Sequence, residues 1–341
     1  MGAADTSLAT TMATEMADDL VAESLAPHGV PERVNYATGV LLGADDFAAE
    51  QLYTRSRMSR AFAALYGHGT LAGLRVSCQA FANPELEVFV APGLAQDRLG
   101  RLIELRRTQC IHIARWLAQR AALAATALER VGVIDAVRED SPGEKRLVFD
   151  VFARFAICPH GKTPAFAAGP FNATDYVVPS RLADASDLSL QIAHTVGATT
   201  ANPKGVLAVP RPRPAKLEAM LADLQGITDP VALEAARRLW CMESALDAWP
   251  EPSLLDPNRL PRLAEHASDA DWDKVLLARI SVPVQQADAA AFPSVDSAAL
   301  AANAARPEPP PTEHREPRWR ELADNGLRPI VFNPYSWRGA L

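Results

Sequence analysis

The spacing of apolar residues predicts one long amphipathic helix near the start of the ordered chain. Residues 47–66 contain no glycine or proline, and four large apolar side chains recur there at helical spacing, namely Met58, Phe62, Leu65 and Tyr66. We expect this apolar stripe to pack inward against the rest of the protein. Asp45 and Asp46 are the expected cap of the helix, because carboxylates at an N-terminus accept backbone hydrogen bonds and suit the helix dipole.

Shorter apolar or alternating runs after this helix predict strands, which glycine, proline and asparagine separate. Strands are expected at 71–76, 86–90, 102–105, 146–158, 188–196, 275–282 and 327–332. Further helices are expected at 113–130, 215–225 and 230–248, and loops at 159–179 and in the proline-rich stretch 203–214. The order of elements predicts an α+β fold: an N-terminal helix packs on a mainly antiparallel β core, with a helical segment in the second half.

Composition along the chain divides it into four expected segments. Residues 1–30 are rich in small and acidic residues and predict a disordered tail. Residues 31–200 carry the helix and β core, and residues 201–304 carry a helical segment and a returning strand. Residues 305–341 are a proline-rich connector and C-terminal tail. In that tail, Tyr335 and Trp337 are the candidate interaction residues, since aromatic side chains are enriched at interfaces.

Overall charge and cysteine usage exclude several classes of function. The 341 residues carry a net charge of −7, which argues against nucleic-acid binding because that binding needs a basic surface. No apolar run has the length needed to span a bilayer, and the first residues lack the pattern of a secretory signal. The four cysteines form no CxxC pair. We therefore expect a cytoplasmic protein with no membrane span.

Residues 90–105, VAPGLAQDRLGRLIEL, are the most informative short stretch of the chain. Gly93 and Gly100 are misplaced for a phosphate-binding loop, and a strand pattern follows Gly100 where such a loop requires a helix. The interpretation is a shaped hairpin corner: both glycines are expected to supply positive φ and Asp97 to accept nearby backbone hydrogen bonds. The residues that define this corner are Pro92, Gly93, Asp97, Gly100 and Arg101.

Candidate catalytic and metal-binding residues are few. Cys158 and His160 carry zinc-ligand chemistry, but the remaining histidines and cysteines, His112, His194, Cys110 and Cys241, show no ligand spacing. Cys158 is therefore expected to be a buried strand-end cysteine. His68 follows the long helix between two glycines and lacks a recognisable nucleophile partner. The prediction is a protein without catalytic residues, cofactor or metal.

Two stretches resemble bacterial phage-tail-like proteins from contractile injection gene clusters. Residues 39–55, GVLLGADDFAAEQLYTR, followed by residues 67–76, GHGTLAGLRV, match a pattern of a helix leading into a glycine-rich strand. Residues 90–103 resemble the V-x-P-G-x-A-x-D-x-x-G-R-x-I hairpin of tail-fibre and baseplate-associated components. The resemblance covers residues 34–106 and is patchy to residue 282; Val40 stands where glutamine is common.

This resemblance implies a non-enzymatic structural or adaptor component of a contractile injection assembly, attached to baseplate, fibre or cap through contacts with other subunits. It carries over no catalytic residues. Two other classes stay open from the residues alone. A ligand- or carbohydrate-binding module predicts a concave, aromatic-lined pocket with converging polar groups. A hydrolase or metalloenzyme predicts that the side chains of His68, Cys158 and His160 converge.

Overall fold

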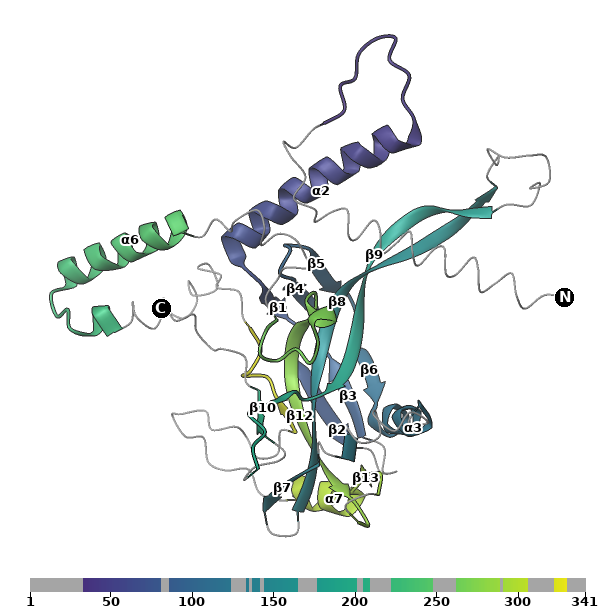
Figure 1. The fold of residues 1–341 in the computed structure, drawn as a ribbon, viewed down its shortest axis with the longest axis vertical. Helices are drawn as coiled ribbons and strands as arrows, with labels where there is room; N and C mark the ends of the chain where they lie inside the picture. Colours follow the sequence, from purple (N-terminus) through teal and green to yellow (C-terminus); the bar gives the residue numbers. More distant parts are fainter. Residues whose placement is uncertain are drawn as a thin grey trace.

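The computed structural model describes residues 33–80, 86–123, 133–134, 137–141, 144–164, 177–200, 205–208, 222–247, 262–288, 291–305 and 322–329. Within these ranges the protein is α+β, with a long helix before a core of antiparallel sheets and a further helix in the second half (Figure 1). The fold class expected from the sequence is thereby confirmed.

The helices are α2 Ala44–Tyr66, α3 Ile113–Leu123, α6 Pro230–Asp247, α7 Ser297–Ala305 and the 3₁₀ turn η3 Asp269–Asp271. The first strands are β1 Gly69–Gly73, β2 Val76–Ala80, β3 Leu86–Val90, β4 Gly93–Gln96, β5 Leu102–Leu105, β6 Gln109–His112 and β7 Val137–Ser141. The later strands are β8 Glu144–Pro164, β9 Val177–Ile192, β10 Thr195–Val196, β11 Val206–Leu207, β12 Val275–Gln285, β13 Ser294–Val295 and β14 Ala323–Asp324.

Antiparallel pairing organises these strands into small sheets around β8 and β12. The strand orders are β1-β4-β5, β2-β3-β6 and β13-β12-β8-β7, with β14 beside β12, β9 beside β8, and a separate β10-β11 pair. Pairing of β12 with β8 runs from Val275↔Ala153 to Pro283↔Arg146. The returning strand of the second half therefore shares one sheet with the core of the first half.

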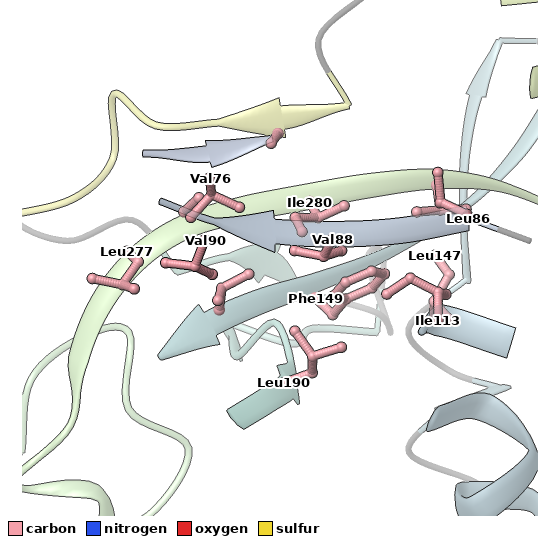
Figure 2. Packing of buried hydrophobic residues seen from close by; sticks show 14 of the residues in the cluster. Val76, Leu86, Val88, Val90, Ile113, Leu147, Phe149, Leu190, Leu277 and Ile280 are labelled. Atoms are coloured by element: carbon pink, nitrogen blue, oxygen red, sulfur yellow. The ribbon is translucent and has the colours of Figure 1, made fainter. Parts of the chain in front are cut away.

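The hydrophobic core lies between the β2-β3-β6 sheet and the β8–β12 sheet. Figure 2 shows Val88 and Val90 of β3 facing Phe149 of β8 and Ile280 of β12, with Ile113 of α3 at one side. All five side chains are fully buried. Alternating burial along β3, in which Leu86, Val88 and Val90 face inward, is the pattern of a strand with one covered face.

A buried ion pair lies on the other face of the β8–β12 sheet, because Asp150 and Arg279 alternate with the core residues Phe149 and Ile280. Arg279 of β12 donates from Nε to Oδ1 of Asp150 at 2.7 Å and from Nη2 to Oδ2 at 2.9 Å. The two residues are register partners across β8 and β12. Arg279 Nη2 also donates to the carbonyl of Ala208 at 2.7 Å, so the guanidinium joins the sheet to the β11 segment. Burial raises the pKa of Asp150, and Arg279 opposes that shift.

The segment 322–329 packs back onto the first sheets. Asn325 accepts from the backbone N–H of Val76 and donates to its carbonyl, both at 2.9 Å, as a neighbouring strand would. Thr70 N–H donates to the Pro329 carbonyl at 2.8 Å. Arg328 is buried and donates to the carbonyl of Gly73 at 3.2 Å. Residues near the C-terminus thus complete the edges of β1 and β2.

Several element boundaries differ from the sequence-based expectations. The expected strand 71–76 is interrupted at Leu74, which has φ 54 and divides β1 from β2. Residues 159–164 and 177–179 were expected in a loop, yet β8 and β9 pair as far as Pro164↔Val177, which satisfies their backbone hydrogen bonds in a two-stranded ribbon. Residues 327–329 are not a strand; β14 at 323–324 is the last strand in the described residues.

Several expectations fall on residues outside the described ranges. These are the N-terminal tail 1–30, the helical stretches 124–130 and 215–221, the proline-rich residues 209–214 and 306–317, and the end of the chain with Tyr335 and Trp337.

Candidate functional site

The hairpin expected in residues 90–105 lies at 93–105, where β4 pairs with β5 from Gly93↔Leu105 to Gln96↔Leu102. Residues 93–96, expected in the loop, form one of its strands. Val90 belongs instead to β3 in the other sheet, so the chain changes sheets at Ala91 and Pro92. Asp97 holds the turn because its Oδ1 accepts from the backbone N–H groups of Leu99 and Arg101, both at 2.9 Å. This is the local hydrogen bonding expected of an aspartate at a turn.

Arg101 ties the tip of the hairpin to two other parts of the fold. Its Nε donates to Asp97 Oδ2 at 2.6 Å, and its Nη2 lies 3.7 Å from Asp273 Oδ2. The guanidinium carbon lies 5.0 Å from the ring centre of Phe155 and 5.3 Å from that of Trp272, within the range of cation–π attraction. Burial raises the pKa of Asp97, and Arg101 opposes the shift.

The two glycines of the hairpin serve different purposes. Gly100 has the expected positive φ of 82°, and a Cβ there would lie 1.8 Å from the carbonyl oxygen of Ser59 on α2. The expectation for Gly93 was wrong, because Gly93 is not among the residues with positive φ. It is required by close approach instead: a Cβ would lie 2.3 Å from the backbone nitrogen of Leu74.

The cap of α2 also differs from the expectation. The N-cap residue is Gly43, and its backbone N–H donates to Asp46 Oδ2 at 2.7 Å. Asp45 and Asp46 lie in the first turn, where negative charge suits the helix dipole. Asp46 therefore contributes to the cap from inside the helix, as the third residue of a capping box does.

The expected inward packing of the α2 stripe was wrong. No residue of α2 is buried, and Met58, Leu65 and Tyr66 are 54%, 71% and 42% exposed. Phe62 is half-buried and, with Met58 and Ser59, lines a groove against the hairpin, where Ser59 and Ala63 approach Gly100. Periodicity identifies a distinctive face of a helix, but it does not show how far a neighbouring element covers that face.

An exposed stripe follows α2 for most of its length, with residues 47, 51, 54, 58, 61 and 65 at alternating spacings of four and three, all exposed. Its apolar members, which we call the α2 apolar stripe, are Phe47, Met58, Ala61 and Leu65. At about 100° per residue these positions lie within about 40° of Phe47 around the axis. This spacing is that of helices which dock into a partner's groove.

A shallow groove separates α2 from the hairpin and the β8–β9 ribbon. Its volume is about 190 Å³, and its lining includes Arg55, Phe62, Arg101, Phe155 and Asp184. Ligand pockets usually exceed about 300 Å³. The groove therefore has the mixed aromatic and polar lining of a binding site at less than the usual size.

The outer half of β8 and β9 projects from the core as a two-stranded ribbon (Figure 1). Cys158 and His160 lie on it, opposite Ala183 and Arg181. Both are exposed, so the expected burial of Cys158 was wrong. Strand pairing in the ribbon continues to Pro164↔Val177, beyond the strand end expected at Cys158.

His68 lies elsewhere, beside Arg98 and His266, and burial lowers its pKa to about 4. His266 is fully buried, whereas Cys158 and His160 are exposed on the ribbon. The convergence expected of a hydrolase with these three residues is not among the contacts of the described residues.

The imidazole of His266 predicts a pH dependence of stability. Its side chain is fully buried, and its Nε2 lies 3.1 Å from the Lys274 carbonyl, which requires the proton on Nε2. Burial is the main cause that lowers its pKa to about 4. The hydrogen bond to the Lys274 carbonyl and the Asp271 carboxylate oppose this shift, and the charges of Arg98 and Lys274 add to it. Between about pH 6.5 and pH 4 the imidazole is therefore protonated in the unfolded state but neutral in the folded state.

Acidification from pH 7 to pH 5 should accordingly cost about 2 kcal/mol of stability through His266. In His266→Gln the amide can still donate to Lys274 but does not titrate, so this part of the pH dependence should vanish. Urea unfolding of both proteins at several pH values measures the difference. Equal slopes of stability against pH in the two proteins would contradict the assignment.

A cluster that the sequence analysis missed lies on the β2-β3-β6 sheet. Glu87 of β3, Cys110 and His112 of β6 bring their donor atoms within 4.8 Å of one another. Cys110 and His112 show no ligand pattern in the sequence, because the third member lies 23 residues before Cys110. Only the pairing of β3 with β6 brings it beside them.

Two comparisons with known proteins found no match to this chain. No protein-family model matches it, and a search of curated proteins found no match. None of the helices in the described residues has the length and apolarity to cross a membrane.

Proposed function

We propose that the protein is a non-enzymatic structural or adaptor component of a phage-tail-like contractile injection assembly and acts through contacts with neighbouring subunits. The resemblance of residues 34–106 to such proteins supports this proposal. The observation that carries it is the exposure of α2: a helix of 23 residues with apolar side chains has no buried residue.

The α2 apolar stripe is suited to contact with another protein subunit. Phe47 and Leu65, at its two ends, are 53% and 71% exposed and lie about 27 Å apart along the helix axis. An exposed apolar surface on a folded protein commonly marks an interaction site. A subunit with a complementary groove would bury these side chains and so favour association.

The β8–β9 ribbon offers a second contact surface beside α2. It projects beyond the core (Figure 1) and exposes Leu182, half of whose side chain is accessible. Outside the core, β8 and β9 pair only with each other in the described residues. An extended ribbon of this kind reaches a neighbouring subunit without disturbing the core from which it comes.

The double variant Met58→Glu/Leu65→Glu tests the α2 contact. Both side chains are exposed, so folding should be unaffected, whereas two carboxylates would have to be desolvated in the interface. We expect at least about a tenfold loss of the protein from purified sheathed particles, since each central apolar contact is worth at least about 1 kcal/mol. Quantitative immunoblotting of the particles measures the loss.

Ala64→Glu is the matched control, because residue 64 is also exposed on α2 but lies about 100° around the helix from Phe47. It should leave incorporation unchanged. If the double variant were incorporated as well as the wild-type protein, α2 would not be part of the interface. Particles that assemble and contract normally without this protein would defeat the adaptor proposal as a whole.

The groove beside α2 favours one other function, a ligand- or carbohydrate-binding module. Phe62 and Phe155 supply aromatic surface there and Asp184 a hydrogen-bond acceptor. Arg101 lines the same groove, and its Nη1 has no hydrogen-bond partner in the described residues. Binding of oligosaccharides to the purified protein that is lost in Phe155→Ala would support this alternative.

A further inference from the structure

Three side chains with different donor atoms meet on the outer face of the β2-β3-β6 sheet. Glu87 is the register partner of His112, and Cys110 is the partner of Phe89, two residues along β3. Side chains of directly paired residues, and of residues two apart, share one face of a sheet. Glu87, Cys110 and His112 therefore lie on one face, opposite to that of the buried Val88.

Their separations are close to those of ligands around one metal ion. His112 Nδ1 lies 2.9 Å from Glu87 Oε1, and Cys110 Sγ lies 3.2 Å from Glu87 Oε2. In a tetrahedral zinc site with bonds of 2.0–2.3 Å, neighbouring donor atoms lie about 3.3–3.8 Å apart. A small opening of the present hydrogen-bonded arrangement would thus admit an ion between the three donors.

We propose that Glu87, Cys110 and His112 bind a Zn²⁺ ion or a chemically similar transition metal, with one coordination position left for a fourth donor. The sulfur and imidazole donors select such ions over Mg²⁺ and Ca²⁺, which prefer oxygen ligands. A thiolate and a carboxylate together balance the two positive charges of the ion. The inference does not depend on the adaptor function, since it needs no partner.

Metal binding at this site requires the loss of one proton. In the present arrangement the Cys110 thiol donates to Glu87 Oε2 at 3.2 Å. The ligand in such a site is the thiolate, so this proton passes to solvent as the metal–sulfur bond forms. Affinity should consequently increase with pH, as in other thiolate sites.

The surroundings leave room for the fourth donor. A hollow of about 230 Å³ has His112 in its wall, together with Leu86, Ala114 and Arg115. Cys110 is exposed and His112 is about half exposed. Water or an anionic donor can reach this side of the cluster, and Arg115 favours an anion.

A second cysteine–histidine pair with the same spacing lacks a third ligand beside it. Cys158 and His160 on β8 are also separated by one residue and are also exposed. Their partners on β9 are Ala183 and Arg181; neither can serve as a third ligand, and the arginine repels a cation. Among the described residues, Glu87, Cys110 and His112 are the one group of three with converging donor atoms.

Titration of the full chain, cleared of metal with a chelator, tests the proposal with Zn²⁺ and Co²⁺. We expect one tightly bound ion per chain, release of one proton, and a cobalt spectrum with a thiolate charge-transfer band. Cys110→Ser and His112→Ala should each weaken Zn²⁺ binding by more than about 100-fold, because even indirect partners of ligands are worth about 10–100-fold. Glu87→Gln should weaken it in the same direction.

Cys158→Ser/His160→Ala is the matched control and should leave Zn²⁺ affinity and the cobalt spectrum unchanged. Far-ultraviolet circular dichroism checks that each variant is folded, which the exposure of Cys110 and His112 leads us to expect. The proposal is overturned if the wild-type chain binds no ion with the thiolate band. It is equally overturned if the control loses binding while Cys110→Ser retains it.

Discussion

Arg279→Met is expected to lower the free energy of unfolding by about 3–5 kcal/mol, the usual cost of leaving one member of a buried ion pair without its partner. Asp150 is fully buried, and both of its oxygens accept from Arg279. Without the guanidinium, the carboxylate would remain buried without its partner or take up a proton. Urea unfolding at pH 7, followed by circular dichroism, measures the loss.

The same strand supplies the control for this prediction. Arg154 of β8 donates to Asp187 of β9 at 3.0 Å, again between register partners, but both side chains are about half exposed. Arg154→Met should cost less than about 1 kcal/mol, because solvent screens such pairs. The double variant Asp150→Leu/Arg279→Met should be less destabilised than Arg279→Met. A similar loss in Arg154→Met and Arg279→Met would refute this account of the buried ion pair.

Gly93→Ala is expected to cost roughly 3 kcal/mol, at the upper end of the usual penalty for overpacking. The added Cβ would lie 2.3 Å from the Leu74 nitrogen and 2.4 Å from the Ala72 oxygen. Both are backbone atoms of the neighbouring strand segment, which cannot move aside as a side chain would. Thermal and urea unfolding of the variant measure the effect.

Gly226→Ala controls for the general consequence of replacing a glycine. Nothing lies within 4 Å of a Cβ at Gly226, and its φ is not positive. Its stability should be unchanged or slightly raised, because alanine restricts the unfolded chain. If Gly93→Ala were as stable as Gly226→Ala, the close approach of β4 to β1 would be wrong.

Local patterns identified most elements of the fold because their physical causes are local. The run at 102–105 and the turn before it needed only alternation, glycine and aspartate, and the structure has both. Strand β8 was recognised but ended too early at Cys158. Its continuation depends on pairing with β9. Pairing between residues that are distant in the sequence cannot be recognised from the sequence of either strand alone.

Two further features could not be predicted for the same reason: which side of α2 is covered, and which cysteine–histidine pair has a third ligand beside it. The apolar spacing of α2 shows that one side is distinctive, but Gly100 in a later hairpin determines which side meets the core. Likewise Cys110 and Cys158 each precede a histidine by two residues. Their difference lies in the opposite strand, where one has Glu87 nearby and the other has Ala183.

The contact of Asn325 with Val76, across 249 positions of sequence, has a consequence for synthesis in the cell. A nascent chain exposes β1 and β2 on the ribosome long before residue 325 leaves the exit tunnel. Until then the edge of β2 lacks the amide that later pairs with it, and unpaired edges promote aggregation. We therefore expect closure of the β2 edge to be a late folding step, which cannot precede the synthesis of residue 325.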